Sequence, residues 1–168
     1  VNEKIYDNNV VKKPWGYEYV VYRNKDLCIT FLNINPKQST SLHSHIQKKT
    51  GFLVLQGEAE IQLGLYKSQR EKFKAPSKVM IRPGLFHQIS NKSKKKTLIA
   101  LEFESPTGKQ DLIRFEDRYG RSNKKYEGKE GFKNITKPLI LKSLKKFKLQ
   151  KFSINNIKLE FHTSKVCR

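Results

Sequence analysis

Three of the four histidines of this chain lie in two short segments whose spacing suits metal binding. His43 and His45 flank a serine, and because side chains alternate across a β-strand, both imidazoles would lie on one face of a strand. His87 follows a Pro-Gly turn further along the chain. Imidazoles suit a divalent transition metal (Zn, Fe, Mn, Ni or Co) and leave coordination positions open for water or substrate. The spacing therefore predicts a metal site formed by His43, His45 and His87.

The elements that must position these histidines are short β-strands. Between residues 17 and 104, runs rich in valine, isoleucine, phenylalanine and tyrosine alternate with turns rich in glycine, proline, asparagine, serine and lysine. The runs cover residues 17–22, 27–34, 52–56, 59–66, 78–82 and 97–103. This pattern is typical of an all-β sandwich or barrel. In a barrel, the two histidine segments can converge on one interior point.

The two histidine segments resemble the two-part motif of the cupin superfamily. The first part is His-x-His at residues 43–45, followed by Gly57, and the second is Pro-Gly-x-x-His-x-x-x-Asn at residues 83–91. The resemblance implies an all-β, cupin-type double-stranded β-helix, which is a jelly-roll barrel.

One position of the motif departs from the superfamily. The resemblance implies a glutamate ligand at position 50, where this chain has Thr50. Because a hydroxyl is a poor substitute for a carboxylate, we expect a three-histidine or weakened site, or a replacement ligand from elsewhere. The candidates for that replacement are Gln47, Glu58, Glu60 and Glu102.

Two further segments narrow the resemblance to the isomerase domain of type II mannose-6-phosphate isomerases. Residues 13–18 (KPWGYE) are similar to the first motif of that domain and residues 111–121 (DLIRFEDRYGR) to its closing motif. The likeness covers residues 12–121. The departures lie around the histidines: His43 stands where the family usually has glutamine, and Ile46 and Gln47 stand where its histidine run would continue.

This resemblance implies a sugar phosphate as the substrate. Aldose–ketose isomerisation moves a proton between adjacent carbons, so it needs a base near the carbon acid and a cation near the two oxygens. We take Glu102 and Arg114 as candidate catalytic residues. The phosphate needs lysine or arginine, and the candidates are Lys13, Arg114, Arg118 and Arg121. The arginines of the closing motif have a structural alternative, an arginine–carboxylate lattice at the end of the barrel or at a dimer contact.

Two other functions compete with an isomerase. A three-histidine site without a carboxylate could support an Fe(II) oxygenase or another metal-dependent cupin enzyme, since coordination positions stay open. A cupin whose metal site has degraded could also bind a sugar without turnover. Whether the chain is an enzyme therefore stays open at the level of sequence.

The formal charge of +20 raises nucleic acid as a partner. Lysine outnumbers arginine 28 to 7, however, whereas recognition of bases and phosphates favours the planar guanidinium of arginine. The lysines also gather in turns and loop edges. We therefore expect a solvated surface or attraction of an anionic small molecule, with nucleic acid an unlikely partner.

After residue 121 the composition changes. We expect residues 1–121 to form the barrel, and residues 122–168 to form a basic accessory extension that packs on the barrel or on a second subunit. Lys137 to Phe152 could form a basic amphipathic helix or an edge hairpin, and Phe152 to Phe161 reads as a strand. Binding of this extension to a membrane surface is a less favoured alternative.

The remaining expectations concern location and assembly. No apolar run is long enough for a membrane helix and no secretory signal is visible, so we expect a soluble, cytoplasmic protein. Two widely separated cysteines indicate no disulfide framework. Because cupins commonly pair through their sheets, the resemblance implies a homodimer.

Overall fold

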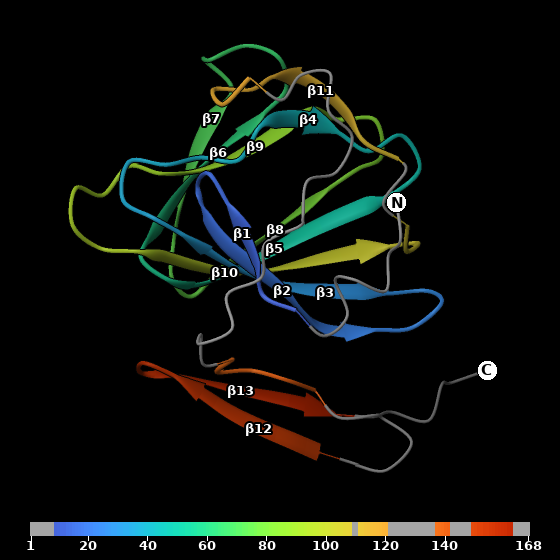
Figure 1. The fold of residues 1–168 in the computed structure, drawn as a ribbon, viewed down its shortest axis with the longest axis vertical. Helices are drawn as coiled ribbons and strands as arrows, with labels where there is room; N and C mark the ends of the chain where they lie inside the picture. Colours follow the sequence, from blue (N-terminus) through green and yellow to red (C-terminus); the bar gives the residue numbers. More distant parts are fainter. Residues whose placement is uncertain (1–8, 109–110, 121–136, 142–148, 163–168) are drawn as a thin grey trace.

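The computed structural model describes residues 9–108, 111–120, 137–141 and 149–162, and it contains two large antiparallel sheets that face each other (Figure 1). The large sheet has the order β1 (Val11–Lys13), β2 (Gly16–Arg23), β3 (Cys28–Ile34), β10 (Leu98–Ser105), β5 (Lys49–Gln56) and β8 (Ser77–Ile81). The small sheet has the order β11 (Ile113–Glu116), β4 (Leu42–Ser44), β9 (His87–Asn91), β6 (Glu58–Leu63) and β7 (Arg70–Lys74). The predicted all-β jelly-roll barrel is thereby confirmed.

The third element is a two-stranded C-terminal hairpin of β12 (Leu149–Ile154) and β13 (Ile157–His162). In Figure 1 it forms a separate layer beside the large sheet, on the side away from the small sheet. The described ranges hold no helix at all, and therefore none long and apolar enough to cross a membrane.

Strand β10 shows how one sequence run serves two sides of the large sheet. Because successive side chains point to opposite faces, Leu98 and Ala100 enter an inner cluster between the sheets, whereas Leu101 enters an outer cluster under the hairpin. Even-numbered residues of β10 therefore face the inner cluster, and odd-numbered residues face the outer cluster. β10 is therefore buried on both faces, as its nearly continuous apolar sequence requires.

The inner cluster occupies the space between the two sheets. Its buried members are Trp15, Leu32, Ile34, Phe52, Val54, Ala59, Ile61, Ile81, Ile89, Leu98 and Ala100. The same inward row of β10 continues with Glu102 and Glu104. The barrel interior is thus apolar at one end of β10 and carries carboxylates at the other.

The outer cluster lies between the large sheet and the C-terminal hairpin. Its buried members are Val10, Tyr19, Val21, Ile29, Phe31, Leu55, Leu101, Leu139, Leu141 and Ile154, with Phe152, Ile157, Leu159 and Phe161 packed against them. The chain approaches the hairpin along β2, where the Leu139 N–H donates to the Tyr19 hydroxyl (3.2 Å) and the Leu141 N–H to the Val21 carbonyl (3.1 Å).

The expectations for residues 137–161 meet mixed outcomes. The strand expected at its end is confirmed, although it is split by a turn into the hairpin. The alternative of a helix over 137–152 is wrong at its described ends, because residues 137–141 are irregular and 149–152 belong to β12; residues 142–148 lie outside the described part. Alternation explains the outcome, since Phe152 and Ile154 face the barrel while Lys151 and Ser153 face solvent.

Two cross-strand registers place the residues of interest. His43 of β4 lies directly opposite His87 of β9, which joins the two halves of the sequence motif. In the large sheet, Thr50 of β5 lies directly opposite Glu104 of β10. Gly57 links β5 to β6, and therefore one sheet to the other, with a φ of 84° that favours glycine.

Candidate metal centre

The three histidines of the sequence motif meet inside the barrel. One nitrogen from each of His43, His45 and His87 lies within 4.8 Å of the others. The ring centroids are 4.5 Å apart for His43 and His87, 5.2 Å for His43 and His45, and 5.8 Å for His45 and His87. The strand pairing of β4 with β9 produces this convergence from residues far apart in the sequence.

Each imidazole is held in the same tautomer by a backbone carbonyl. The Nδ1–H of His43 donates to the Ser41 carbonyl at 2.8 Å, and that of His45 donates to the Asp111 carbonyl at 2.8 Å. The Nδ1–H of His87 donates to the Leu85 carbonyl at 3.0 Å. Since a carbonyl only accepts, every Nε2 keeps its lone pair for another partner. The Nε2 of His87 is buried and has no hydrogen-bond partner among the described residues. This donor set fits a divalent transition metal.

Burial keeps these rings neutral. It lowers the pKa of His87 to about 4, and it lowers the pKa of His43 well below 6.5 with help from the neighbouring His87 and His45. Burial also lowers the pKa of His45, although the nearby Glu104 carboxylate opposes that shift. Neutral imidazole is the form that binds a metal, so the three ligands need not release protons at pH 7.

Asp111 organises the loop behind His45. Its carboxylate accepts hydrogen bonds from the backbone N–H groups of residues 46–48 at 3.0, 2.8 and 3.2 Å. The His45 carbonyl in turn accepts from the N–H of Gly84 at 2.8 Å, which ties the loop to the Pro-Gly turn before His87. Sequence reasoning gave Asp111 no individual role, although it opens the closing motif.

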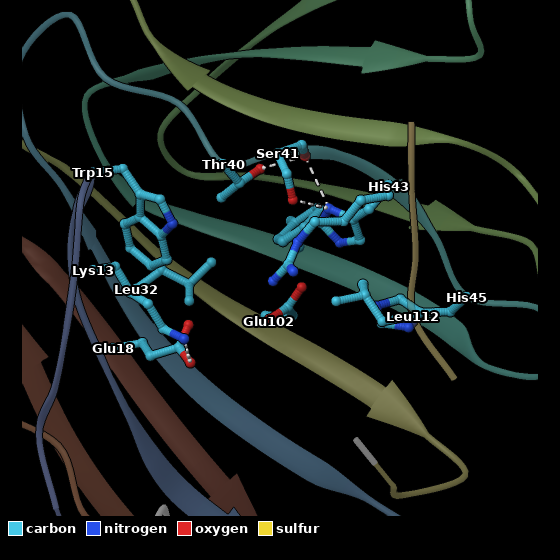
Figure 2. Close-up of a pocket in the computed structure, with 12 residues that line it drawn as sticks. Lys13, Trp15, Glu18, Leu32, Thr40, Ser41, His43, His45, Glu102 and Leu112 are labelled. Carbon is cyan, nitrogen blue, oxygen red and sulfur yellow. Dashed lines mark hydrogen bonds and ion pairs between the residues drawn. The ribbon is translucent and has the colours of Figure 1, made fainter. Parts of the chain in front are cut away.

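A cavity of about 50 Å³ opens beside His43 and His45. Figure 2 shows it between Trp15, Lys13 and Glu18 on one side and His43, His45 and Leu112 on the other, with Glu102 pointing into it. Its remaining lining residues include Thr40, Ser41, Phe52 and Arg114. Lys13 and Glu18 form a buried ion pair at 3.3 Å. The structure thus brings the predicted residues Lys13, Glu102 and Arg114 to the histidines.

Arg118, another predicted phosphate-binding residue, does not line this cavity. Arg118 lines a separate groove of about 570 Å³ together with Gln88 and Ser90, which alternate with the inward side chains of β9 and therefore lie on the outer face of the small sheet. Arg121 lies outside the described residues. The larger groove contains no converging histidines, so the smaller cavity is the candidate site.

None of the expected carboxylates on β6 replaces the glutamate implied at position 50. Glu58 and Glu60 point outward and pair with Lys72 (3.8 Å) and Lys92 (3.2 Å), and Gln47 is exposed. The carboxylate of Glu104 does approach the histidines, since its Oε1 lies 3.4 Å from His45 Nε2. Sequence reasoning missed Glu104, because its proximity arises from strand register.

Glu104 has a second buried neighbour. Its Oε1 accepts a hydrogen bond from the ammonium of Lys48 at 2.9 Å, and both side chains are almost fully buried. Across the register, Thr50 is also buried and its hydroxyl has no hydrogen-bond partner among the described residues. An acid, a cation and an orphaned hydroxyl therefore share this end of the barrel.

Solved structures with the same architecture confirm the class of fold. A conserved protein with a double-stranded β-helix domain from Klebsiella pneumoniae matches with a TM-score of 0.53 and 21% identity, over 66% of this chain and 82% of its own. The capsular polysaccharide assembling protein CapF from Staphylococcus aureus matches with a TM-score of 0.55 and 16% identity, over 64% of this chain and 34% of its own. The chain therefore has the double-stranded β-helix fold.

Sequence comparison then gives the family. Residues 2–117 match the family model described as "Mannose-6-phosphate isomerase C-terminal", and the chain belongs to this family. The xanthan biosynthesis protein XanB of Xanthomonas campestris is 27% identical over 116 residues, which are 67% of this chain and 24% of that protein. The chain therefore spans about a quarter of the length of the curated relatives it matches.

Proposed function

We propose that this chain is a metal-dependent cupin that acts on a phosphorylated or nucleotide-linked sugar, most simply as an aldose–ketose isomerase of the mannose-6-phosphate type. The observation that carries the proposal is the set of three neutral histidines, with Nε2 atoms unused by their backbone anchors, beside a cavity that holds Glu102, Lys13 and Arg114. The family description and the name of XanB support sugar chemistry.

Different residues of the cavity would have different roles in such a reaction. A divalent metal held by His43, His45 and His87 would polarise the two oxygens of the sugar. Glu102 would take the proton from the carbon beside the carbonyl and return it to the adjacent carbon, while the electron pair of the broken C–H bond passes through an enediolate. Lys13 and Arg114 would bind anionic oxygens of the substrate.

The size of the cavity limits which part of the substrate it can hold. A volume of about 50 Å³ accommodates a few hydroxyl-sized groups, since one water needs roughly 10–15 Å³ by the same kind of measure. We infer that the reacting carbons enter the cavity and that the rest of the sugar, with its phosphate, lies outside it. Arg118, in the separate groove, is therefore not part of this proposal.

A turnover screen tests the proposal. Protein reconstituted in turn with Zn²⁺, Mn²⁺, Fe²⁺, Co²⁺ and Ni²⁺ is incubated with hexose and heptose phosphates, and isomers are followed by NMR. We expect isomer formation with at least one metal, loss of metal in His87→Ala, and loss of turnover with retained metal in Glu102→Gln. Oxygen consumption would favour the oxygenase instead, and stabilisation by a sugar phosphate without turnover would favour the binding protein.

A homodimer remains part of this proposal, with a restriction from the fold. The C-terminal hairpin covers the outer face of the large sheet, so a partner cannot pack directly on the outer cluster. We infer that pairing would use the polar face of the hairpin or a sheet edge such as β8. Sedimentation analysis of the purified chain measures the assembly directly.

A further inference from the structure

The chemical feature that calls for explanation is the short approach between His45 and Glu104. The Nδ1–H of His45 is committed to the Asp111 carbonyl, so Nε2 of the neutral ring presents a lone pair. This lone pair faces the carboxylate oxygen of Glu104 at 3.4 Å. Two acceptors at such a separation in a buried site repel each other unless a cation lies beside them, and in this structure the Lys48 ammonium, 2.9 Å from Glu104 Oε1, is that cation.

The separation also suits two ligands of one metal ion. Nitrogen and oxygen donors bind zinc-like metals at about 2.1 Å, and two such donors at a tetrahedral angle lie about 3.4 Å apart. His45 and Glu104 therefore already have the spacing of a ligand pair. Both side chains are almost completely buried, where an anionic ligand would offset the charge of a divalent cation that three neutral imidazoles leave uncompensated.

Strand register explains why the carboxylate comes from position 104. Thr50 and Glu104 are direct neighbours across β5 and β10, so their side chains leave the same face of the large sheet side by side. The hydroxyl of Thr50 is short and has no hydrogen-bond partner among the described residues, whereas Glu104 is long enough to reach His45. A carboxylate moved to the adjacent strand thus arrives at the same end of the barrel.

We propose that Glu104 is the anionic ligand of this metal site, in the place that Thr50 cannot fill, and that Lys48 competes with the metal for its carboxylate. In the structure the Lys48 ammonium lies 2.9 Å from Glu104 Oε1. Among the described residues, the possible metal-ligand atoms within 4.8 Å of one another belong to His43, His45 and His87, and Glu104 is not in this group. The Glu104 side chain must therefore turn from Lys48 toward His43 and His87 when metal binds. This inference rests on the metal site of the proposed function.

Metal titration tests the inference without any enzymatic assay. Zn²⁺ binding to metal-free protein is measured by calorimetry, and Co²⁺ binding by its visible spectrum, which reports the donor set. Glu104→Gln should weaken affinity about tenfold or more and change the Co²⁺ spectrum. The matched control is Glu102→Gln, on the same face of the same strand, which should leave metal affinity within about twofold of wild type.

Two further variants keep the result interpretable if Glu104→Gln folds poorly with Lys48 buried and unpaired. Lys48→Met retains Glu104 and removes its competitor, so it should raise metal affinity. Thr50→Glu combined with Glu104→Gln returns a carboxylate to the facing strand position and should restore part of the lost affinity. Folding of each variant is checked by thermal denaturation.

The outcomes separate this inference from the proposed function. Unchanged affinity and spectrum in a folded Glu104→Gln protein, or no gain in Lys48→Met, would overturn the role of Glu104 while leaving the three-histidine site intact. A wild-type protein that takes up no metal would overturn both. Metal binding that depends on Glu104 without any sugar-phosphate turnover would support this inference and defeat the isomerase.

Discussion

The inner and outer clusters both bury aliphatic side chains, but the residues that lie beside the two clusters differ. Between the two sheets, the apolar residues adjoin buried histidines and the Lys48–Glu104 pair. Under the C-terminal hairpin, the cluster consists of aliphatic and aromatic residues, with stacked rings such as Tyr19 and Phe31 at 4.8 Å. The difference teaches that the candidate metal centre lies inside the barrel, whereas the hairpin covers the opposite face of the large sheet.

The largest expected effect comes from a matched pair of substitutions, one in each cluster. Ile61→Ala empties a fully buried position between the sheets and should lower the unfolding free energy by about 4 kcal/mol. Ile154→Ala lies at the less enclosed hairpin contact and should cost about 2 kcal/mol. Urea denaturation measures both, and Ile154→Ala should leave metal affinity unchanged. Equal costs for the two variants would mean that the hairpin is as central to the fold as the inner cluster.

A second prediction concerns acid between about pH 6.5 and 4, which should act mainly on the inner region through its buried histidines. In metal-free protein the folded-state pKa of His87 is about 4, whereas an unfolded histidine titrates near 6.5. Below pH 6.5 the unfolded chain therefore binds a proton at His87 that the folded chain does not bind, and the free energy of unfolding falls until about pH 4. His87 alone corresponds to a loss of about 3 kcal/mol across that window, and His43 shifts in the same direction.

Urea unfolding with a chelator at pH 7 and pH 5 measures this acid effect. His87→Gln should flatten the pH dependence, whereas His162→Gln, at an exposed position of the hairpin, should not. Hydrogen exchange at pH 5 should show β4 and β9 losing protection before β12 and β13. Equal stability at the two pH values would contradict the neutral, buried state of the histidines.

The smallest expected effect is at Thr50. Its hydroxyl is buried without a hydrogen-bond partner among the described residues, so Thr50→Val keeps the shape and removes an unsatisfied group. The unfolding free energy should stay the same or rise by about 1 kcal/mol, and metal affinity should not change. A clear drop in metal affinity would show that the hydroxyl is a ligand and would weaken the case for Glu104.

The strands and the histidine cluster of the inner region were predictable from the sequence, whereas the contacts of Glu104 with His45 and Lys48 were not. Period-two alternation and the turn residues predict the strands, and the His-x-His spacing places two imidazoles on one face. In the structure, Lys13, Glu102 and Arg114 line the same cavity as His43 and His45. Arg118 instead lines a separate groove together with Gln88 and Ser90.

What the sequence alone determined is therefore local: which runs form strands, which residues share a strand face, and which histidines can act together. These depend on the geometry of neighbouring residues, which a sequence displays directly. Only the tertiary structure decided that Glu104 stands beside Thr50, that Lys48 holds its carboxylate, and that the C-terminal hairpin covers the large sheet. Each of these depends on strand register and on packing between distant segments, which no local pattern encodes.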